Sequence, residues 1–171
     1  MTDLELVEGL RRRDPEVVAR LLERYGDEIQ AVAQLILRDR SEAEDVLIET
    51  LVTAWQRGSS VREPGALRAW LLRVATNHSL SLRRRLTRPL RQPRLMPGPT
   101  ASADHAPAAD TRLTILAEVD RLPTRMRAAL VLHYYADLPV DEVAHILGRS
   151  PNTVKAQLRV ALDRLRTGLG G

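Results

Sequence analysis

The chain has 171 residues and no cysteine, so it can form one ordinary domain or two small ones without a disulfide framework or a thiolate metal site. Its 26 lysine and arginine residues exceed its 22 acidic residues, which leaves a formal net charge of +4. The N-terminus lacks the apolar core of a signal peptide, and no apolar run approaches the roughly 18 residues of a membrane span. We therefore expect a soluble, cytoplasmic protein.

The first third of the sequence predicts two helices. A short amphipathic segment covers Leu4 to Leu10. Asp14 followed by Pro15 then predicts a helix start, with Asp14 as N-cap. From there apolar residues recur at i, i+3, i+4 and i+7 as far as Ile36, which is the stripe of a helix packed in a bundle.

Two further helices complete the predicted N-terminal half. Ser41 and Glu44 have the spacing of a capping box and are followed by apolar residues with helical period. The stretch from Arg57 to Ser60 breaks that pattern, and another helix is predicted from near Pro64. We expect residues 1–86 to form one helical domain.

Residues 87–111 differ from the rest of the chain. They hold half of its ten prolines and show no apolar periodicity, so they predict a flexible linker. Between Arg83 and Arg94 there are six arginines and no acidic residue. Such a density suits a polyanionic partner, and a solvated face or a disordered arm is an equally open interpretation.

The last third predicts a helix-turn-helix. Residues 140–147 read as a short amphipathic helix that ends at Gly148, because glycine tolerates the left-handed conformation at a helix end. Ser150 and Pro151 have the residue types that start another helix. So short a connection between two helices is typical of helix-turn-helix proteins, although an ordinary helical hairpin has the same pattern. We expect residues 112–171 to form a second helical domain.

The second helix of this motif divides into two faces. At about 100° per residue, Val154 and Leu158 lie on an apolar face, whereas Asn152 and Arg159 point away from it. Small, polar and basic groups therefore open the outer face at its N-terminal end, where a recognition helix meets base edges. The helix N-terminus also favours a phosphate.

Both halves resemble one protein family. The segments Leu122 to Arg127 and Leu138 to Lys155 resemble region four of extracytoplasmic-function sigma factors. The segments Ser41 to Trp55 and Arg68 to Arg84 resemble region two of the same family, in family order across the linker. The resemblance implies an all-α protein of two small domains, a region-two bundle and a region-four helix-turn-helix bundle, joined by a Pro-rich linker.

That resemblance implies a promoter-reading subunit of bacterial RNA polymerase, which directs the core enzyme to promoters and helps to open them. Region four would bind the −35 element as duplex, and region two would hold the −10 element as single strand. The candidate −35 contacts are Arg149, Ser150, Asn152, Thr153, Lys155 and Arg159. The candidate −10 contacts are Arg62, Arg73, Asn77, His78, Ser81 and Arg84.

A third surface is predicted on the region-two helix that follows Ser41. On a helical wheel Ile48 and Val52 point away from the bundle stripe, among Asp45, Glu49 and Gln56, and an outward apolar pair beside acidic groups is typical of a docking patch. The resemblance implies that this patch binds the β′ clamp helices of core polymerase, and that region four contacts the β flap. Family members usually have Gln in place of Ile48 and often Asp in place of Ser81.

The sequence bears on other functions as well. The four histidines show no metal-ligand spacing and no paired carboxylates stand apart from ordinary helical faces, so we expect no metal, no cofactor and no enzymatic activity. One alternative is a helix-turn-helix regulator that binds duplex DNA without opening it. Another is an interaction protein that titrates an anti-sigma factor, a partner that the resemblance also implies for a sigma factor.

Overall fold

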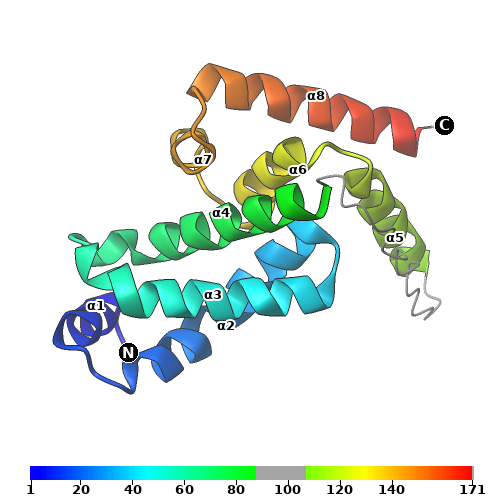
Figure 1. Ribbon diagram of the computed structural model, residues 1–171. Helices are drawn as coiled ribbons and strands as arrows, with labels where there is room; N and C mark the ends of the chain where they lie inside the picture. The colour runs from blue at the N-terminus through cyan, green and yellow to red at the C-terminus, as the bar shows by residue number, and fades with distance from the viewer. Residues whose placement is uncertain (88–106, 171) are drawn as a thin grey trace.

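The computed structural model describes residues 1–87 and 107–170, and within them every regular element is helical, as predicted (Figure 1). The polypeptide forms an N-terminal bundle of four α-helices and a C-terminal bundle of four more. In chain order the elements are α1 Asp3–Arg12, α2 Val17–Leu37, α3 Arg40–Arg57, η1 Gly58–Ser60, η2 Pro64–Ala66, α4 Leu67–Thr87, α5 Pro107–Asp120, α6 Thr124–Leu130, η3 Val131–Tyr135, α7 Val140–Leu147 and α8 Pro151–Leu169.

The N-terminal bundle is built on three long helices, α2, α3 and α4, that pack against one another, with α1 at one end (Figure 1). The predicted stripe on α2 is buried at Leu21, Tyr25, Ile29 and Ile36, whereas Leu22 is exposed. Leu21, Tyr25 and Ile29 belong to one buried cluster with the apolar residues Leu67 and Leu71 of α4. The apolar spacing thus identified the inward face of α2, although Leu22, which fits the same spacing, faces solvent.

The start of α2 differs from the prediction. The helix begins at Val17, and its N-cap Glu16 makes no side-chain capping bond. Asp14 instead stabilises the turn before the helix, because its Oδ1 accepts a hydrogen bond of 3.0 Å from the Glu16 backbone N–H and its carbonyl accepts one from Val17. The side chain of Asp14 therefore bonds its own turn rather than the first turn of α2.

The N-cap of α3, unlike that of α2, lies earlier in the chain than predicted. The N-cap is Asp39, with extended backbone, and its Oδ1 accepts from the Glu42 backbone N–H at 2.9 Å. Ser41 consequently lies inside the first turn and Glu44 in the second. Asp39 and Glu42 have the same three-residue spacing as the pair chosen from the sequence, so two overlapping capping signals compete and the aspartate is the one used.

The two ends of the predicted linker, residues 87–111, are helical. Thr87 still belongs to α4 and residues 107–111 already belong to α5. Pro107 is the first residue of α5, and a proline is well tolerated there because its missing N–H would have no intrahelical partner. Residues 88–106, which hold the rest of the predicted linker and the end of the arginine run, lie outside the described part of the chain.

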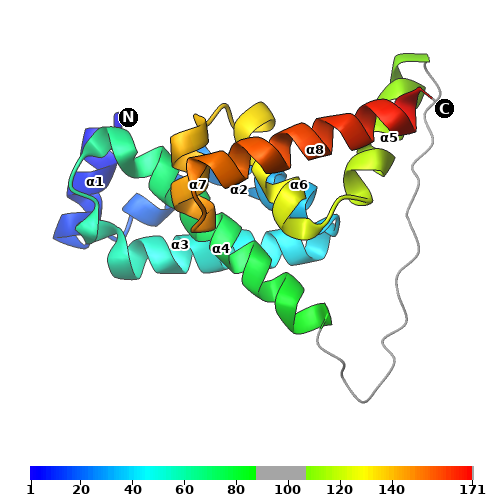
Figure 2. The same ribbon diagram turned by 90° about the horizontal axis from the view of Figure 1, so that it is seen from above.

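The C-terminal bundle places α8 outermost. The helix packs on α5, α6 and α7, and α6 continues through the π-helical turn η3 (Figure 2). Val143 and Leu147 of α7 meet Val154 and Leu158 of α8 in one buried cluster. The helix-turn-helix predicted from residues 140–165 is therefore formed, and its second helix runs along the surface of the molecule.

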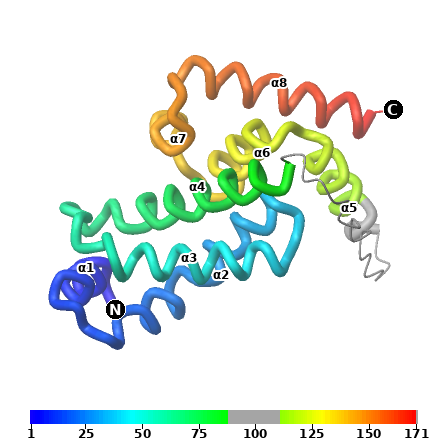
Figure 3. The backbone as a smooth tube through the Cα atoms, viewed as in Figure 1, coloured from blue at the N-terminus to red at the C-terminus, as the bar shows by residue number. Residues whose placement is uncertain are grey.

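The hydrophobic cluster of the C-terminal bundle does not end at that bundle. It includes Val32 and Ile36 of α2 and Leu72 and Leu80 of α4, all of them buried. As a result α6 and η3 lie on α2, and α6 and α7 lie on α4 (Figure 3). The two bundles are packed together through an apolar contact.

Polar groups join the bundles at the edge of this contact. The Arg127 side chain is 3% exposed, and its Nε donates to the Ile36 carbonyl at 2.8 Å. That carbonyl lies in the last turn of α2, where helix carbonyls lack intrahelical partners and favour a cation. Burial, and then repulsion by Arg83, lowers the pKa of Arg127 from its ordinary value. Arg38 forms a further ion pair with Asp120.

A second polar link involves Arg68 of α4. Its guanidinium forms an ion pair with Glu28 of α2 and also donates to the Ala136 carbonyl of the C-terminal bundle at 2.7 Å. The hydrogen bond to Glu28 raises the pKa of Arg68. One side chain thus ties two helices of one bundle to the other bundle.

No helix within residues 1–87 or 107–170 combines the length and the apolar character needed to cross a lipid bilayer.

Candidate nucleic-acid and polymerase interfaces

The helix-turn-helix turn is built as the sequence predicts. Gly148 ends α7 with a left-handed backbone (φ 61°), and its N–H and that of Arg149 donate to carbonyls of the last turn of α7. Ser150 then caps α8, because its Oγ accepts from the Thr153 backbone N–H at 3.2 Å. Pro151 is the first residue of α8. The turn thus fixes the N-terminal end of α8 at the surface.

The predicted faces of α8 are those of the structure. Val154, Leu158 and Ala161 are buried. The six candidate −35 contacts are all exposed, but their side chains are not equally free. The Ser150 and Thr153 hydroxyls lie 2.9 Å apart and bond each other, whereas no side-chain bond within the described residues engages Asn152, Lys155 or Arg159. The exposed residues are Arg149, Ser150, Asn152, Thr153, Lys155 and Arg159.

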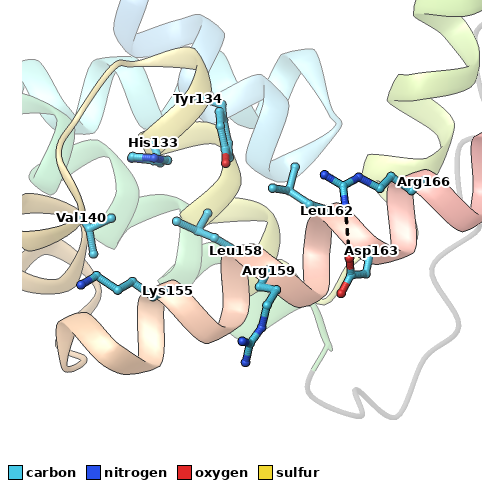
Figure 4. A pocket seen from close by; sticks show the side chains of 9 residues that line it. All are labelled: His133, Tyr134, Val140, Lys155, Leu158, Arg159, Leu162, Asp163 and Arg166. Atoms are coloured by element: carbon cyan, nitrogen blue, oxygen red, sulfur yellow. Dashed lines mark ion pairs between the residues drawn. The ribbon is translucent and has the colours of Figure 1, made fainter.

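A groove runs beside this face, between α8 and η3 (Figure 4). Leu158 and Leu162 point toward Tyr134, whereas Arg159 points away from it. Lys155 lies at one end of the groove, and Asp163 and Arg166 face each other at 3.7 Å at the other end. The basic groups of α8 are therefore presented at the rim of the groove, outward from the bundle.

Three of the six candidate −10 contacts gather on one side of α4. Arg73, Asn77 and Arg84 are exposed and line a cleft between α4 and the end of α7. The Arg73 Nη1 lies 2.9 Å from the Nε2 of His145 on α7. The helix-turn-helix unit thus lies directly against the part of α4 that holds three of the candidate −10 contacts.

The other three −10 candidates lie elsewhere. His78 is half-buried and its Nε2 is 3.1 Å from the Thr53 hydroxyl of α3. Ser81 is half-buried on α4. Arg62 is exposed between η1 and η2, where its carbonyl accepts from Arg11. The structure therefore brings together only half of this predicted set.

The candidate polymerase patch is a continuous surface of α3. Ile48 is 59% exposed and Val52 is 45% exposed, which is unusual for large apolar side chains without a partner. Asp45, Glu49 and Gln56 beside them are exposed as well. The opposite face of α3 packs inward through Val46, Thr50 and Ala54. The patch therefore points away from the bundle core, and none of its residues lines the cleft.

Sequence reasoning missed the C-terminal residues that face α4. Arg125 of α6 and His145 of α7 line the cleft with Arg73, and the Arg125 Nη1 lies 3.4 Å from the Leu147 carbonyl. Arg127 links the bundles on the other side of α6. No local pattern distinguishes these residues from ordinary helix residues, because their positions follow from how the two bundles pack.

Comparison with known proteins identifies the family of both bundles. Residues 21–89 match the family described as Sigma-70 region 2, and residues 112–165 match Sigma-70, region 4. Together these two matches cover most of the chain, in family order. The chain belongs to the extracytoplasmic-function group of the sigma-70 family. The residues quoted for the resemblance fall inside the two matched ranges.

Individual relatives agree with this placement. The chain is 28% identical over 173 residues to the ECF RNA polymerase sigma factor SigM of Mycobacterium tuberculosis H37Rv, covering 99% of the chain and 85% of that protein. It is 29% identical over 164 residues to SigL of the same strain, covering 94% and 93%. The fold is also that of the sigma factor RpoE solved with the anti-sigma factor NepR from Bartonella quintana, with a TM-score of 0.69, 21% identity and coverage of 91% and 98%.

Proposed function

We propose that this sigma factor binds core RNA polymerase through α3, reads the −35 element through α8 and holds the opened −10 strand along α4. In this proposal residues 1–86 act as the core- and −10-binding domain, residues 87–111 as the linker and residues 112–171 as the −35-binding domain. The observation that carries the proposal is the presence, in one chain of this family, of three separate exposed surfaces with different chemistry.

Each surface suits its assigned partner. The α8 surface offers an amide, an ammonium and a guanidinium near a helix N-terminus, the groups that pair with base edges and phosphates in a major groove. The α4 surface offers guanidinium groups and the Asn77 amide, which can bind unstacked bases and a single-stranded backbone. The α3 surface is apolar at its centre and acidic at its edge, which suits another protein rather than DNA.

We also propose an anti-sigma factor as a regulatory partner. The solved relative RpoE of Bartonella quintana was determined with its anti-sigma factor NepR, and its fold extends over 91% of this chain. A protein that covers α3 or α8 would compete with polymerase or promoter at the same surface.

Run-off transcription tests the proposal. Purified core polymerase is assayed on promoter candidates upstream of the genes neighbouring this one, with and without the chain. A transcript that requires the chain is expected. Duplex binding without any such transcript would favour a helix-turn-helix regulator, and neither binding nor transcript would favour a protein that only titrates an anti-sigma factor.

Two matched variants test the assignment of α3 to core polymerase. Ile48→Asp should abolish co-purification with core polymerase, because it places a charge at the centre of the apolar patch. Leu22→Asp is the control, because Leu22 is 46% exposed on α2 and lies outside the patch. Equal retention of polymerase by both variants would refute the assignment of α3.

A template comparison tests the assignment of α4. Asn77→Ala should reduce transcription from a duplex promoter and recover on a template whose −10 region is already opened by mismatches, because opening no longer has to be driven by strand binding. A variant that loses polymerase binding, such as Ile48→Asp, should stay inactive on both templates. Equal loss of activity by Asn77→Ala on the two templates would contradict a role in opening.

A further inference from the structure

The cleft between the two bundles has an unusual lining. It has a volume of about 330 Å³ and is formed by α4 on one side and by α6 and the end of α7 on the other. Its polar lining consists of Arg73, Asn77 and Arg84 from α4, Arg125 from α6 and His145 from α7. Leu80, Ile146 and Leu147 supply its apolar walls. The cleft exists only while the bundles are packed together.

The cationic groups of the cleft have no acidic counterpart. Among the described residues no carboxylate lines the cleft, and no ion pair involves Arg73, Arg84 or Arg125. Arg68, which lies on α4 outside the cleft, is by contrast paired with Glu28. Three guanidinium groups beside apolar walls concentrate positive potential at this point of the surface.

Hydrogen-bond donors remain available there. An arginine carries five N–H donors and no acceptor. Arg73 uses one of them toward the His145 ring, which must present its unprotonated Nε2 to accept it, and Arg125 uses one toward the Leu147 carbonyl. Within the described residues, the side chains of Asn77 and Arg84 form no hydrogen bond or ion pair, and only the Arg84 carbonyl accepts, from the Thr87 hydroxyl. The cleft is thus rich in donors that face solvent, a chemistry that fits an anion with several acceptor oxygens.

The spacing of the arginines favours an extended anion. Arg73 and Arg84 are eleven residues apart on α4, or about 16 Å along a helix with a rise of 1.5 Å per residue. A short chain of phosphoryl groups can lie between the two long side chains and contact both of them. One guanidinium group can bind two oxygens of a phosphoryl group at once. Each arginine could therefore hold a different phosphoryl group of the anion.

We propose that this cleft binds a small oligophosphate anion, of the class of tripolyphosphate or a nucleoside polyphosphate, between Arg73 and Arg84 of α4 and Arg125 of α6. Because its ligands come from both bundles, the anion holds them together. Arg73, Asn77 and Arg84 are also assigned to the −10 strand, so the anion excludes that strand; this consequence, unlike the binding itself, rests on the proposed function.

Calorimetric titration of the full chain with inorganic tripolyphosphate, at fixed ionic strength, tests the binding. One anion per chain is expected, with affinity reduced about tenfold or more in Arg125→Gln and in Arg84→Gln, the loss expected for one charge-assisted contact. Arg164→Gln is the control, because Arg164 is exposed on α8 outside the cleft. Equal affinity in Arg125→Gln and Arg164→Gln, or many weakly bound anions per chain, would overturn the proposal.

A distance measurement tests the bridging. The natural chain has no cysteine, so a spin label can be placed on each bundle through Ser59→Cys and Thr167→Cys without removing any thiol. Tripolyphosphate should narrow the distance distribution between the labels, and Arg125→Gln should abolish the narrowing while circular dichroism shows an intact fold. A distribution unchanged by tripolyphosphate would refute bridging.

A competition separates the free anion from DNA as the occupant. Tripolyphosphate should displace a labelled single-stranded oligonucleotide from the full chain. Oligonucleotide binding that depends on Arg125 but is insensitive to tripolyphosphate would assign the cleft to DNA alone and overturn the proposal. Run-off transcription without added anion does not depend on whether the cleft binds tripolyphosphate. It therefore tests the proposed sigma activity separately from the proposed anion site.

Discussion

The two surfaces assigned to DNA differ in how the free chain presents them. The outer face of α8 lies along the surface with its basic and amide groups exposed, whereas the basic side of α4 lies against α7, with Arg73 in contact with His145. Both surfaces are rich in arginine, so composition alone does not distinguish them. The difference arises from packing between the bundles. It implies that the outer face of α8 is accessible in the free chain, whereas the basic side of α4 becomes fully accessible only when α7 moves.

The largest effect, a loss of stability, is expected in the apolar cluster that the two bundles share. Leu72→Ala should lower the free energy of unfolding by about 2–5 kcal/mol, because Leu72 is fully buried in the cluster that joins α4 to the C-terminal bundle. Urea denaturation measures the loss, and the exposed Leu22→Ala serves as control with a change within about 0.5 kcal/mol. A loss no greater than that of the control would mean that the bundles do not pack as described.

Variants of the outer face of α8 should weaken DNA binding and leave the free energy of unfolding unchanged. Lys155→Ala or Arg159→Ala should weaken promoter binding by the holoenzyme by about 1–3 kcal/mol if a base contact is lost. If the residue neutralises a phosphate, the slope of log affinity against log salt should fall by about 0.9 per contact. Arg112→Ala on α5 is the matched control, and unchanged affinity in both α8 variants would count against α8 as the recognition helix.

A smaller effect is expected at the polar link between the bundles. Arg68→Gln should cost about 1 kcal/mol, because the Arg68–Glu28 pair is only half-buried, with side chains 36% and 27% exposed, and solvent screens it. Arg40→Gln removes a more exposed pair with Glu44 and should cost less. Denaturant midpoints measure the loss of stability in the two variants. A larger loss in Arg40→Gln than in Arg68→Gln would contradict a role of Arg68 in the contact between the bundles.

The smallest effect lies far from both DNA surfaces and serves as a reference point. Hydrogen bonds from the Thr2 backbone and hydroxyl lower the pKa of Glu5 in the capping box of α1. The stabilisation by Glu5 is therefore fully present above the ordinary carboxyl pKa and is lost as the pH falls through the lowered, folded-state pKa. At neutral pH the backbone amides of α1 should exchange faster in Glu5→Gln than in the parent chain. In acid, where Glu5 is protonated, the two exchange rates should become equal. A constant difference at every pH would rule out ionisation of Glu5 as the cause.

The sequence predicted those features that depend on local periodicity. The inward stripe of α2, the two faces of α8 and the left-handed Gly148 follow from spacing and residue type, and the exposed pair Ile48 and Val52 follows from the helical wheel. Helix starts were less predictable, because Asp39 and Ser41 both satisfy capping rules and only the folded backbone selects one of them. Packing between the bundles was not predictable, because the partners are about 70 to 90 residues apart and carry no shared pattern.

The shared apolar cluster also has a consequence for how the chain melts. Residues of α2 and α4 complete the core of the C-terminal bundle, so neither bundle can lose its structure without exposing apolar surface of the other. Heat denaturation should then proceed as a single cooperative event, with equal calorimetric and van't Hoff enthalpies, although the sequence is divided by a Pro-rich segment. A chain built as two modules would in this respect behave thermodynamically as one.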